Sequence, residues 1–309
     1  MIEKPTIVIG DVHGCFFTLQ KLLKQLPHNA EIIFVGDLCD RGNYSKEVIE
    51  CVMHNYVSLL GNHESYMLEY AKPALEGKPN RWIDESYMGG KECLKSYKNA
   101  HDVLFKHLEW IAQNPLYLLR DSYFITHAFA LPYFKRRDIE EKQHSFLVNR
   151  VRDIEKWGHD FEEGYEQYGL INVFGHETFH EVMIQDNLYG IDTSCVYGNK
   201  LSALELGSMK IYEASVHPLD ISPICAADVA SYFETYGVDS IEWVLSEEMI
   251  TLSMKLQPHI VQEAIVSMDE AMQTYLSLFD IDIVQPNASS QMTLLNLTIK
   301  FAKIGATKK

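Results

Sequence analysis

Short apolar runs recur along the first two-thirds of the chain, and each of them ends in a cluster of glycine and polar residues. These runs stand in the stretches TIVIGDVHG, EIIFVGDLCDRG, YVSLLGNHE, SYFITHA and INVFGHE. Runs of four or five residues rich in Ile, Val, Phe and Leu that end at Gly or Asp are typical of buried strands. The pattern therefore predicts five strands, each followed by a polar turn.

A helix is predicted between the first two strands. In CFFTLQKLLKQLP the residues Leu19, Leu22, Leu23 and Leu26 recur at helical spacing, and Pro27 follows the last of them. Strand, helix, strand is the pattern of a parallel sheet in an α/β domain. In such sheets ligands bind beyond the carboxyl ends of the strands. All five polar clusters lie at that end, so the pattern also predicts a ligand site there.

Helical and irregular segments separate the later strands. Residues 65–114 have a largely helical pattern, and we expect them to form a cap beside the site. Residues 129–170 are charged and irregular. The runs LYGIDTSCV, KLSALEL and SMKIYEA predict further strands, which we expect to belong to a second sheet.

The character of the chain changes from about Cys225 onward. The stretches ADVASYFETYG and PHIVQEAIVSMDEAMQTYLSLF predict helices, whereas MITLSMKL and LLNLTIKFAKI alternate apolar and polar positions as strands do. We expect a catalytic domain over residues 1–218 and a small accessory α+β module over residues 219–309. The module has no ligand-type cluster, and it is a candidate for self-association.

Composition and charge limit the classes of protein to which this chain can belong. The chain has 309 residues, of which 47% are hydrophobic and 23% charged, and no stretch reaches the roughly 18 apolar residues of a membrane span. The N-terminus lacks the layout of a secretory signal, so we expect a cytoplasmic protein. The formal net charge of −16 argues against a nucleic-acid partner. Six cysteines without a C-x-x-C pair fit a reducing compartment, where we expect them mostly as core residues.

The strand-end clusters together offer a set of metal-binding and anion-binding side chains: Asp11, His13, Asp37, Asp40, Arg41, Asn62, His63, His127 and His176. Each has a simpler explanation alone, because a lone histidine is usually a core or surface residue and an aspartate after a strand is often a helix N-cap. Their recurrence at every strand end outweighs those explanations. Carboxylate, amide and imidazole ligands suit Mn²⁺, Fe²⁺ or Zn²⁺. Two such ions sharing a carboxylate can clamp both oxygens of an in-line phosphoryl transfer.

The motifs GDVHG, GDLCDRG and GNHE resemble the three signatures of the phosphoprotein phosphatase branch of the calcineurin-like metallophosphoesterases. Within that branch the chain is most similar to the bacterial and bacteriophage-lambda-type serine/threonine phosphatases, from Ile7 to about Leu206. The resemblance implies a β-sandwich flanked by helices, with a dinuclear site at one sheet edge. It also implies two divalent metal ions as cofactors, Mn²⁺ first, with Fe or Zn as alternatives.

The resemblance assigns a role to each motif residue. It implies that Asp11 and His13 bind the first metal and that Asp37 bridges both metals. The remaining ligands of the second metal would be Asn62, His127 and His176. His63 would protonate the leaving group, and Asp40 would orient the His63 ring. Glu64, at the end of the third motif, is expected to support the turn.

Two arginines are implied as phosphate ligands. Arg41 comes directly from the second motif. The second arginine of the family stands in a W-x-R context, and VNR points to Arg150, with Arg152 as the alternative because the tryptophan is missing. The family's HAG is HAF here, since Phe129 replaces the glycine.

The expected function is hydrolysis of phosphomonoesters on phosphoproteins or phosphopeptides, as a serine/threonine phosphatase in which a hydroxide shared by the metals attacks phosphorus. The alternative is a dinucleoside polyphosphate hydrolase, such as one for diadenosine tetraphosphate, or an RNA-decapping relative. These relatives typically lack the second-motif aspartate and end the third motif in Asp, so Asp40 and Glu64 favour the first function. A dinucleotide hydrolase would need further cationic or stacking contacts, for which FKRRD is the candidate in the sequence. A non-catalytic scaffold is disfavoured because the whole set of functional residues is present.

Overall fold

The computed structural model describes residues 4–98, 100–157, 162 and 164–221, followed by four separate strands. The chain divides into two compact units, Met1–Ile221 and Ser222–Lys309.

The first sheet of unit Met1–Ile221 contains the strands of the first two motifs. Its spatial order is β10 (Ile211–Ser215), β9 (Lys200–Glu205), β1 (Thr6–Ile9), β2 (Glu31–Phe34) and β3 (Val57–Ser58). Strands β1, β2 and β3 are parallel, and α1 (Phe16–Leu23) joins β1 to β2, as the sequence predicts. The prediction that KLSALEL and SMKIYEA belong to the second sheet is wrong. They form β9 and β10, because the free edge of β1 pairs antiparallel with β9.

The second sheet contains the strands that precede the two isolated histidines. Its order is β4 (Tyr117–Arg120), β5 (Tyr123–Thr126), β6 (Ile171–Phe174), β8 (Leu188–Gly190) and β7 (Met183–Gln185). Strands β5, β6 and β8 are parallel. The carboxyl ends of β5 and β6 therefore point the same way, which brings the residues after them to one edge of the sheet.

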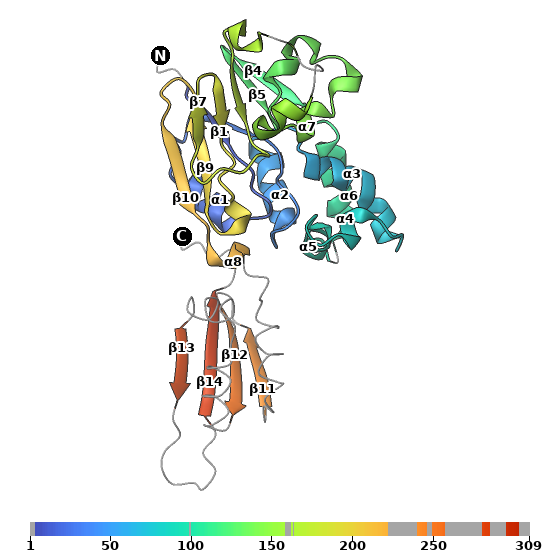
Figure 1. Ribbon diagram of the computed structural model, residues 1–309. Coiled ribbons are helices and arrows are strands. Elements are labelled where there is room, and N and C mark those ends of the chain that lie inside the picture. Colours follow the sequence, from blue (N-terminus) through green and yellow to red (C-terminus); the bar gives the residue numbers. More distant parts are fainter. Residues whose placement is uncertain are drawn as a thin grey trace, which may run out of the picture. The chain divides into compact units, whose positions relative to one another are not determined.

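The two sheets pack face to face, which confirms the predicted β-sandwich (Figure 1). Side chains alternate along a strand, so Val8 of β1 faces the second sheet while Ile7 and Ile9 face the other way. Val8 packs with Ile125 and Val173 of the second sheet. The opposite face of the first sheet is covered by α1 and α2 (Ser45–Asn55). Both faces of β1 are buried, which explains its uninterrupted apolar sequence.

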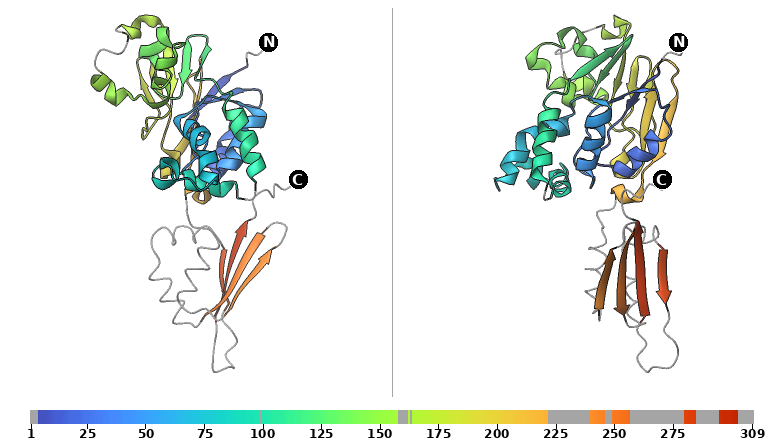
Figure 2. Two further views of the ribbon diagram at one scale, coloured as in Figure 1. Left: turned by 90° about the vertical axis from the view of Figure 1, so that its right-hand side faces the viewer. Right: turned by 180° about the vertical axis from the view of Figure 1, so that it is seen from behind.

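Four helices gather at one side of this unit, drawn in light blue to blue-green in Figures 1 and 2. They are α3 (Asn62–Leu75), α4 (Arg81–Asp84), α5 (Gly90–Ser96) and α6 (His101–Ile111). The helical prediction for residues 65–114 is confirmed. Trp82 of α4 is fully buried and ties this layer to the core.

The segment predicted as irregular consists of short helical turns, drawn in green in Figure 2: η1 (Leu131–Arg136), η2 (Glu140–Lys142), α7 (Ser145–Val148), η3 (Val151–Trp157) and η4 (Tyr165–Tyr168). They cover the outer face of the second sheet with an aromatic cluster that includes Phe129, Phe146 and Phe174. Phe129, the residue that replaces the family's glycine, is thus a buried core residue. Two further short helices are η5 (Cys195–Tyr197) and α8 (Pro218–Ile221).

Unit Ser222–Lys309 contains an antiparallel sheet with the order β11 (Ser240–Leu245), β12 (Met249–Leu256), β14 (Leu295–Ala302) and β13 (Asp280–Val284). The strands predicted at MITLSMKL and LLNLTIKFAKI are confirmed as β12 and β14. Strands β11 and β13 were not predicted. The helices predicted at ADVASYFETYG and PHIVQEAIVSMDEAMQTYLSLF lie outside the described residues.

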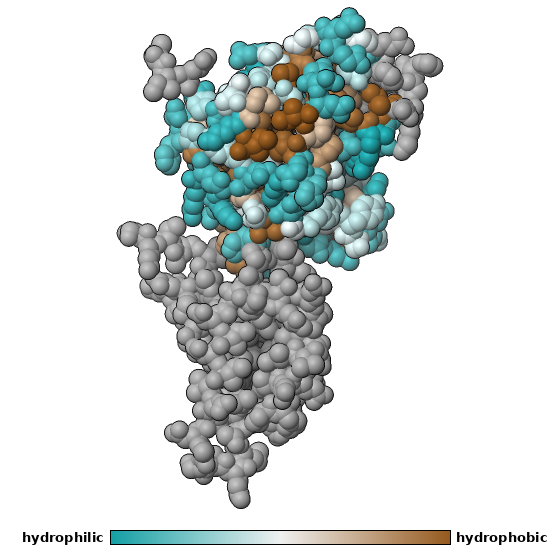
Figure 3. All heavy atoms as spheres, turned by 60° about the vertical axis from the view of Figure 1, so that its left-hand side comes forward, coloured by the Kyte–Doolittle hydropathy of each residue, from teal (hydrophilic) through white to brown (hydrophobic). Residues whose placement is uncertain are grey.

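The surface of the first unit is mostly hydrophilic on the face shown in Figure 3, with a patch of apolar residues in its midst. Ile184 of β7 and Ile211 of β10 are exposed on edge strands of the two sheets. Cys15, Cys39, Cys93 and Cys195 are buried free thiols, as the sequence predicts. No helix in the described part of the chain is long and apolar enough to cross a membrane.

Candidate metal centre

The predicted site residues follow the ends of strands from both sheets. Asp11 and His13 come after β1, Asp37 comes after β2, and Asn62 begins α3 just beyond β3. From the second sheet, His127 follows β5 and His176 follows β6. All six side chains are largely buried, and most of them line one cavity of about 570 Å³.

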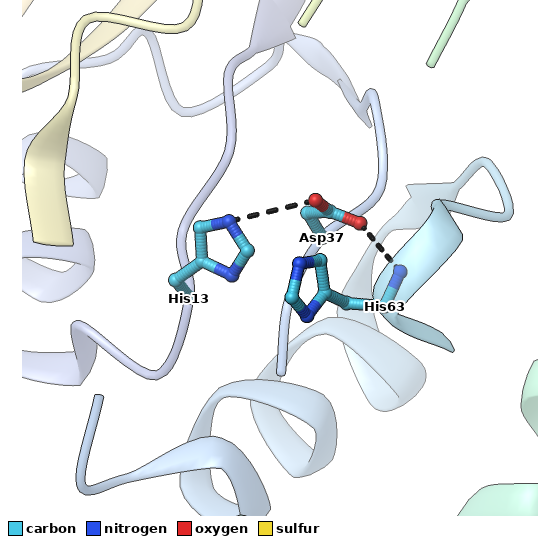
Figure 4. A group of neighbouring side chains, drawn as sticks. All are labelled: His13, Asp37 and His63. Carbon is cyan, nitrogen blue, oxygen red and sulfur yellow. Dashed lines mark hydrogen bonds and ion pairs between the residues drawn. The ribbon is translucent and has the colours of Figure 1, made fainter. Parts of the chain in front are cut away.

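Asp37 lies at the centre of the site (Figure 4). Its two carboxylate oxygens point to different histidines: Oδ2 lies 3.5 Å from His13 Nε2, and Oδ1 lies 3.4 Å from His127 Nε2. Two groups of ligand atoms, each within 4.8 Å, therefore share this residue: His13, Asp37 and His63, and Asp37, His127 and His176. A carboxylate common to two ligand groups has the position required of a bridge between two metal ions.

Asn62 lies beside the second group. Its Oδ1 lies 2.9 Å from both His127 Nε2 and His176 Nδ1. His176 Nε2 is buried, and within the described part of the chain it has no hydrogen-bond partner. Such an orphaned polar atom is costly unless a ligand satisfies it. The amide oxygen of Asn62, the two imidazoles and the carboxylate of Asp37 form a donor set that fits a divalent metal ion.

Backbone carbonyls orient the two histidines that face Asp37. His13 Nδ1 lies 2.8 Å from Cys39 O, and His127 Nδ1 lies 3.0 Å from Val35 O. If each Nδ1–H donates to its carbonyl, each Nε2 keeps a lone pair directed at the site, which is the usual support for a metal-binding histidine. Burial lowers the pKa of His127 to about 4 and that of His176 to about 2, so both rings are neutral at physiological pH. Neutral imidazole is the form that binds metals.

Asp11 lines the cavity but belongs to neither ligand group in the described residues. Its carboxylate accepts hydrogen bonds from the backbone N–H of His176, and burial together with the nearby charge of Asp192 raises its pKa. Asp192 is 5% exposed, and burial raises its pKa to about 6. Asp192 is not among the site residues predicted from the sequence. It could have been found by the same strand-end rule, because it follows β8.

His63 and Asp40 form the predicted pair. His63 Nδ1 lies 2.7 Å from Asp40 Oδ2, and the indole N–H of Trp82 donates to that same oxygen at 2.8 Å. Burial raises the pKa of Asp40 to about 8 and lowers that of His63 to about 4. The hydrogen bond from Trp82 to this pair was not predicted from the sequence, because Trp82 lies 42 residues from Asp40 along the chain.

Arg41 extends across His13 and His63. Its guanidinium nitrogens lie 2.5 Å from His13 Nε2 and 2.8 Å from His63 Nε2. Its backbone N–H donates to Gly89 O, and a Cβ at Gly89 would lie 2.0 Å from Arg41 N. The loop between α4 and α5 thus sets the position of Arg41 by a close approach that needs glycine.

Backbone strain is concentrated at this site. Five of the nine non-glycine residues with positive φ in the described chain are site residues: His13, Asp37, Asp40, Arg41 and His176. Such conformations cost energy and persist where the surrounding structure enforces them, often at functional sites. The turns therefore hold these side chains in orientations that relaxed turns would not give.

Glu64 enforces one of these turns. Its carboxylate accepts hydrogen bonds from the backbone N–H groups of Asp37 at 2.7 Å, Leu38 at 2.7 Å and Gly61 at 3.0 Å. It is fully buried and joins the loop after β2 to the start of α3. The sequence-based expectation that Glu64 supports the turn is confirmed.

The two candidate phosphate arginines differ in their surroundings, although both line the cavity. Arg152 is 61% exposed and its Nε lies 3.7 Å from Glu177. Arg150 Nε is buried, and no hydrogen-bond partner for it occurs among the residues that the structure describes. Its charge also acts on His127 and His176, whose pKa values it helps to lower. Arg150 is therefore the more buried of the two arginines, and its charge acts on the histidines of the second ligand group.

Three comparisons with known proteins bear on this site. The family model for calcineurin-like phosphoesterases matches residues 4–220. A symmetrical bis(5'-nucleosyl)-tetraphosphatase of Ralstonia nicotianae is 25% identical, over 65% of this chain and 89% of that protein. An asymmetrical bis(5'-nucleosyl)-tetraphosphatase of Oceanobacillus iheyensis is 28% identical, over 63% of this chain and 86% of that protein.

Among solved structures, a protein serine/threonine phosphatase of Saccharomyces cerevisiae is 16% identical, with a TM-score of 0.47, over 69% of this chain and 80% of that one. The family match covers both sheets and every strand end that carries a candidate ligand. The chain therefore belongs to the calcineurin-like phosphoesterase family.

Proposed function

We propose that this protein hydrolyses the polyphosphate chain of a dinucleoside polyphosphate, such as a bis(5'-nucleosyl) tetraphosphate, on a centre of two divalent metal ions. The observation that carries the proposal is the presence of four arginines in the cavity lining, beside the three aspartates Asp11, Asp37 and Asp192. Arg41, Arg81, Arg150 and Arg152 all line the cavity, in a protein whose formal net charge is −16. One terminal phosphate needs one or two arginines, whereas a polyphosphate chain offers anionic oxygens to all of them.

The stretch FKRRD does not supply this charge. Arg136 forms an ion pair with Glu162, and the Arg137 guanidinium lies 4.5 Å from the ring centroid of Phe134. Neither arginine is among the residues that line the cavity. The cationic contacts that a dinucleotide hydrolase requires come instead from Arg81 and Arg152, which lie on segments distant from the motifs in sequence.

The relatives also support this activity over the phosphoprotein phosphatase that the sequence motifs favoured. Both relatives described above are named bis(5'-nucleosyl)-tetraphosphatases. The presence of Asp40 and Glu64 does not separate the two functions, because Glu64 holds backbone N–H groups and Asp40 orients His63. Neither role depends on the nature of the substrate.

The chain's own residues account for binding and protonation. His13, Asp37, Asn62, His127 and His176 would hold the metals, with Asp11 beside them. When bound, two such ions lower the pKa of a water molecule and stabilise the charge that develops during attack on phosphorus. Arg41 and Arg150 would orient the phosphate. His63, positioned by Asp40 and Trp82, would give the proton on its Nε2 to the leaving oxygen. Asp40, whose pKa of about 8 lets it hold a proton at neutral pH, would supply a proton to His63 Nδ1 in return.

The test compares kcat/KM for diadenosine tetraphosphate and for a phosphoserine peptide, with purified metal-loaded protein. We expect the dinucleotide to be preferred by about tenfold or more. Chromatography of the products separates symmetrical cleavage, which gives two nucleoside diphosphates, from asymmetrical cleavage, which gives a triphosphate and a monophosphate. A preference for the peptide would instead support a protein phosphatase.

Arg81 provides a sharper test of the cationic lining. Its side chain is 49% exposed and its guanidinium pairs with Glu85 at 3.5 Å. We expect Arg81→Ala to raise the KM for diadenosine tetraphosphate and to leave the hydrolysis of a small aryl phosphate near the wild-type rate. Arg136→Ala is the matched control, because Arg136 lies outside the cavity lining.

The same preparations identify the metal. We propose Mn²⁺ as the native ion, with Fe²⁺ and Zn²⁺ as the alternatives that the ligand types allow. Chelator-treated protein reconstituted with each ion should regain activity to different extents, and elemental analysis should find two ions per chain in the active form.

A further inference from the structure

Two tyrosines at the cavity are the most exposed large hydrophobic side chains in the described residues. Tyr197 is 65% exposed and Tyr87 is 62% exposed, and both line the cavity that contains the metal centre. An aromatic ring left in water loses the burial that normally stabilises it. Two such rings beside one cavity indicate a surface that a ligand covers.

Both tyrosines lie next to Arg41. The guanidinium carbon of Arg41 is 5.5 Å from the centroid of the Tyr197 ring, and Arg41 Nε donates to the backbone carbonyl of Tyr87 at 3.4 Å. Arg41 also reaches His13 and His63. One arginine side chain therefore spans the distance from the metal centre to the Tyr197 ring and to the backbone of Tyr87. A nucleotide whose phosphate lies at the metals would place its base in this region.

Tyr197 stands on a rigid turn. It ends η5, which lies between Ser194 and Gly198, both with positive φ. Its neighbour Cys195 is 2% exposed, and the backbone N–H of Ser194 donates to Asp192 at 2.9 Å. The backbone beneath Tyr197 is thus anchored while its ring remains open, so little ordering energy would be needed to present the ring to a ligand.

Tyr87 is held through its hydroxyl group. This hydroxyl donates to Glu85 and accepts a hydrogen bond from Arg81 at 3.3 Å. The ring lies in the connection between α4 and α5, on a segment distant in sequence from Tyr197. The cavity therefore has aromatic surfaces from two separate parts of the fold.

We propose that Tyr197 and Tyr87 are stacking surfaces for the bases of the nucleotide substrate, with Tyr197 as the main one. This assignment rests on the proposed function, and it adds the part of the site that recognises the nucleoside. Every base has a π face, so stacking of this kind discriminates weakly among bases and favours purines for their larger rings. The site would thus accept different purine dinucleotides with similar affinity.

The test uses two inhibitors that share a diphosphate and differ in the nucleoside: adenosine diphosphate and inorganic pyrophosphate. Inhibition constants are measured with a generic aryl phosphate as substrate, so the result does not depend on dinucleotide hydrolysis. Tyr197→Ala should weaken inhibition by adenosine diphosphate by about 5- to 150-fold. For Tyr197→Ala, inhibition by pyrophosphate should remain within about twofold of wild type. Tyr87→Ala should weaken inhibition by adenosine diphosphate by a smaller factor than Tyr197→Ala does.

Two matched variants complete the experiment. Tyr197→Phe keeps the ring and should bind adenosine diphosphate as the wild type does. Phe105→Ala removes another exposed aromatic ring, 43% exposed and outside the cavity lining, and should change neither constant.

Each other outcome has a definite meaning. Equal weakening of both inhibitors by Tyr197→Ala would overturn the proposal, because it would show that the ring acts by supporting Arg41. No change with either inhibitor would overturn it as well. If stacking is found but diadenosine tetraphosphate is not hydrolysed, the nucleotide subsite stands and the proposed reaction fails.

Discussion

At the scale of single residues, the site depends on side chains that hold other side chains. Asp37 contacts two histidines with different oxygens, and Glu64 fixes the turn that carries Asp37. Trp82 and His63 share one oxygen of Asp40. The strand-end rule finds Asp37 and His63, because ligands follow strands. It cannot find Trp82, since only the packing of α4 against the site brings this indole to Asp40.

We expect Trp82→Phe to lower kcat about tenfold, a part of the roughly 10²–10⁴-fold contribution of a general acid. The reason is that Asp40 loses the indole N–H and orients His63 less well. KM and metal content should stay near wild type, and the loss should shrink on aryl phosphates with acidic leaving groups.

The control for this prediction is His63→Asn. Combining it with Trp82→Phe should cost little more than His63→Asn alone, because both changes remove one function. Additive losses in kcat would show that Trp82 acts independently of His63.

Gly89 offers a second prediction at this scale. A Cβ there would lie 2.0 Å from Arg41 N, at a residue with φ of 84°. We expect Gly89→Ala to displace Arg41 and to raise KM for phosphate substrates, while bound metal measured by elemental analysis is retained.

Gly77→Ala is the matched control for Gly89→Ala. Gly77 also has a positive φ, 74°, but a Cβ there would meet nothing within 4 Å. Both variants should lose stability, on the order of 1 kcal/mol for the backbone conformation. Gly89→Ala should lose more than Gly77→Ala, because its Cβ meets the backbone of Arg41. Only Gly89→Ala should change KM. If both variants had the same KM, Gly89 would not determine the position of Arg41.

At the scale of elements, one contact ties the end of unit Met1–Ile221 to its first helix. Asp220 of α8 accepts hydrogen bonds from the backbone N–H groups of Phe17 at 3.1 Å and Thr18 at 2.7 Å, and from the Thr18 hydroxyl at 2.6 Å. The N-cap residue of α1, Cys15, provides no side-chain cap. Asp220 therefore caps α1 from about two hundred residues away in sequence. Local capping rules could not have predicted this contact.

We expect Asp220→Ala to lower the free energy of unfolding by about 1–2 kcal/mol, because two backbone N–H groups lose their acceptor. Urea denaturation followed by circular dichroism measures the change. Since Asp220 does not contact the metal ligands, activity per folded molecule should remain at the wild-type level.

The pH dependence of this contact has a definite sign. Burial raises the pKa of Asp220 to about 6, so the folded protein retains a proton that the unfolded chain releases near pH 4. The resulting stabilisation is complete below pH 4 and is lost as the pH rises through 6. Relative to Asp220→Asn, the wild type should therefore become less stable from pH 4 to 7. If the wild type instead became more stable over this range, the hydrogen bonds from the backbone N–H groups would lower the pKa of Asp220 by more than burial raises it.

At the scale of the whole molecule, the sequence predicts the sandwich and the edge where the ligands meet, because buried parallel strands leave a strong apolar pattern. It does not predict which sheet receives each late strand. The runs KLSALEL and SMKIYEA look like any half-buried strands, and only the free edge of β1 places them in the first sheet. The residues that line the cavity cannot be predicted from the sequence either, because only the fold brings Tyr87 and Tyr197 to the same cavity.

The division of the chain into Met1–Ile221 and Ser222–Lys309 leads to the last prediction. Every candidate ligand lies in the first unit, and so does Asp220, which caps α1. We expect a protein truncated after Ile221 to fold, to bind two divalent ions per chain and to hydrolyse a small aryl phosphate at a rate close to that of the full chain. Circular dichroism and elemental analysis measure the first two properties, and size-exclusion chromatography of both proteins tests whether the second unit mediates self-association. A truncated protein that is folded but has lost its metal would show that residues after Ile221 complete the centre.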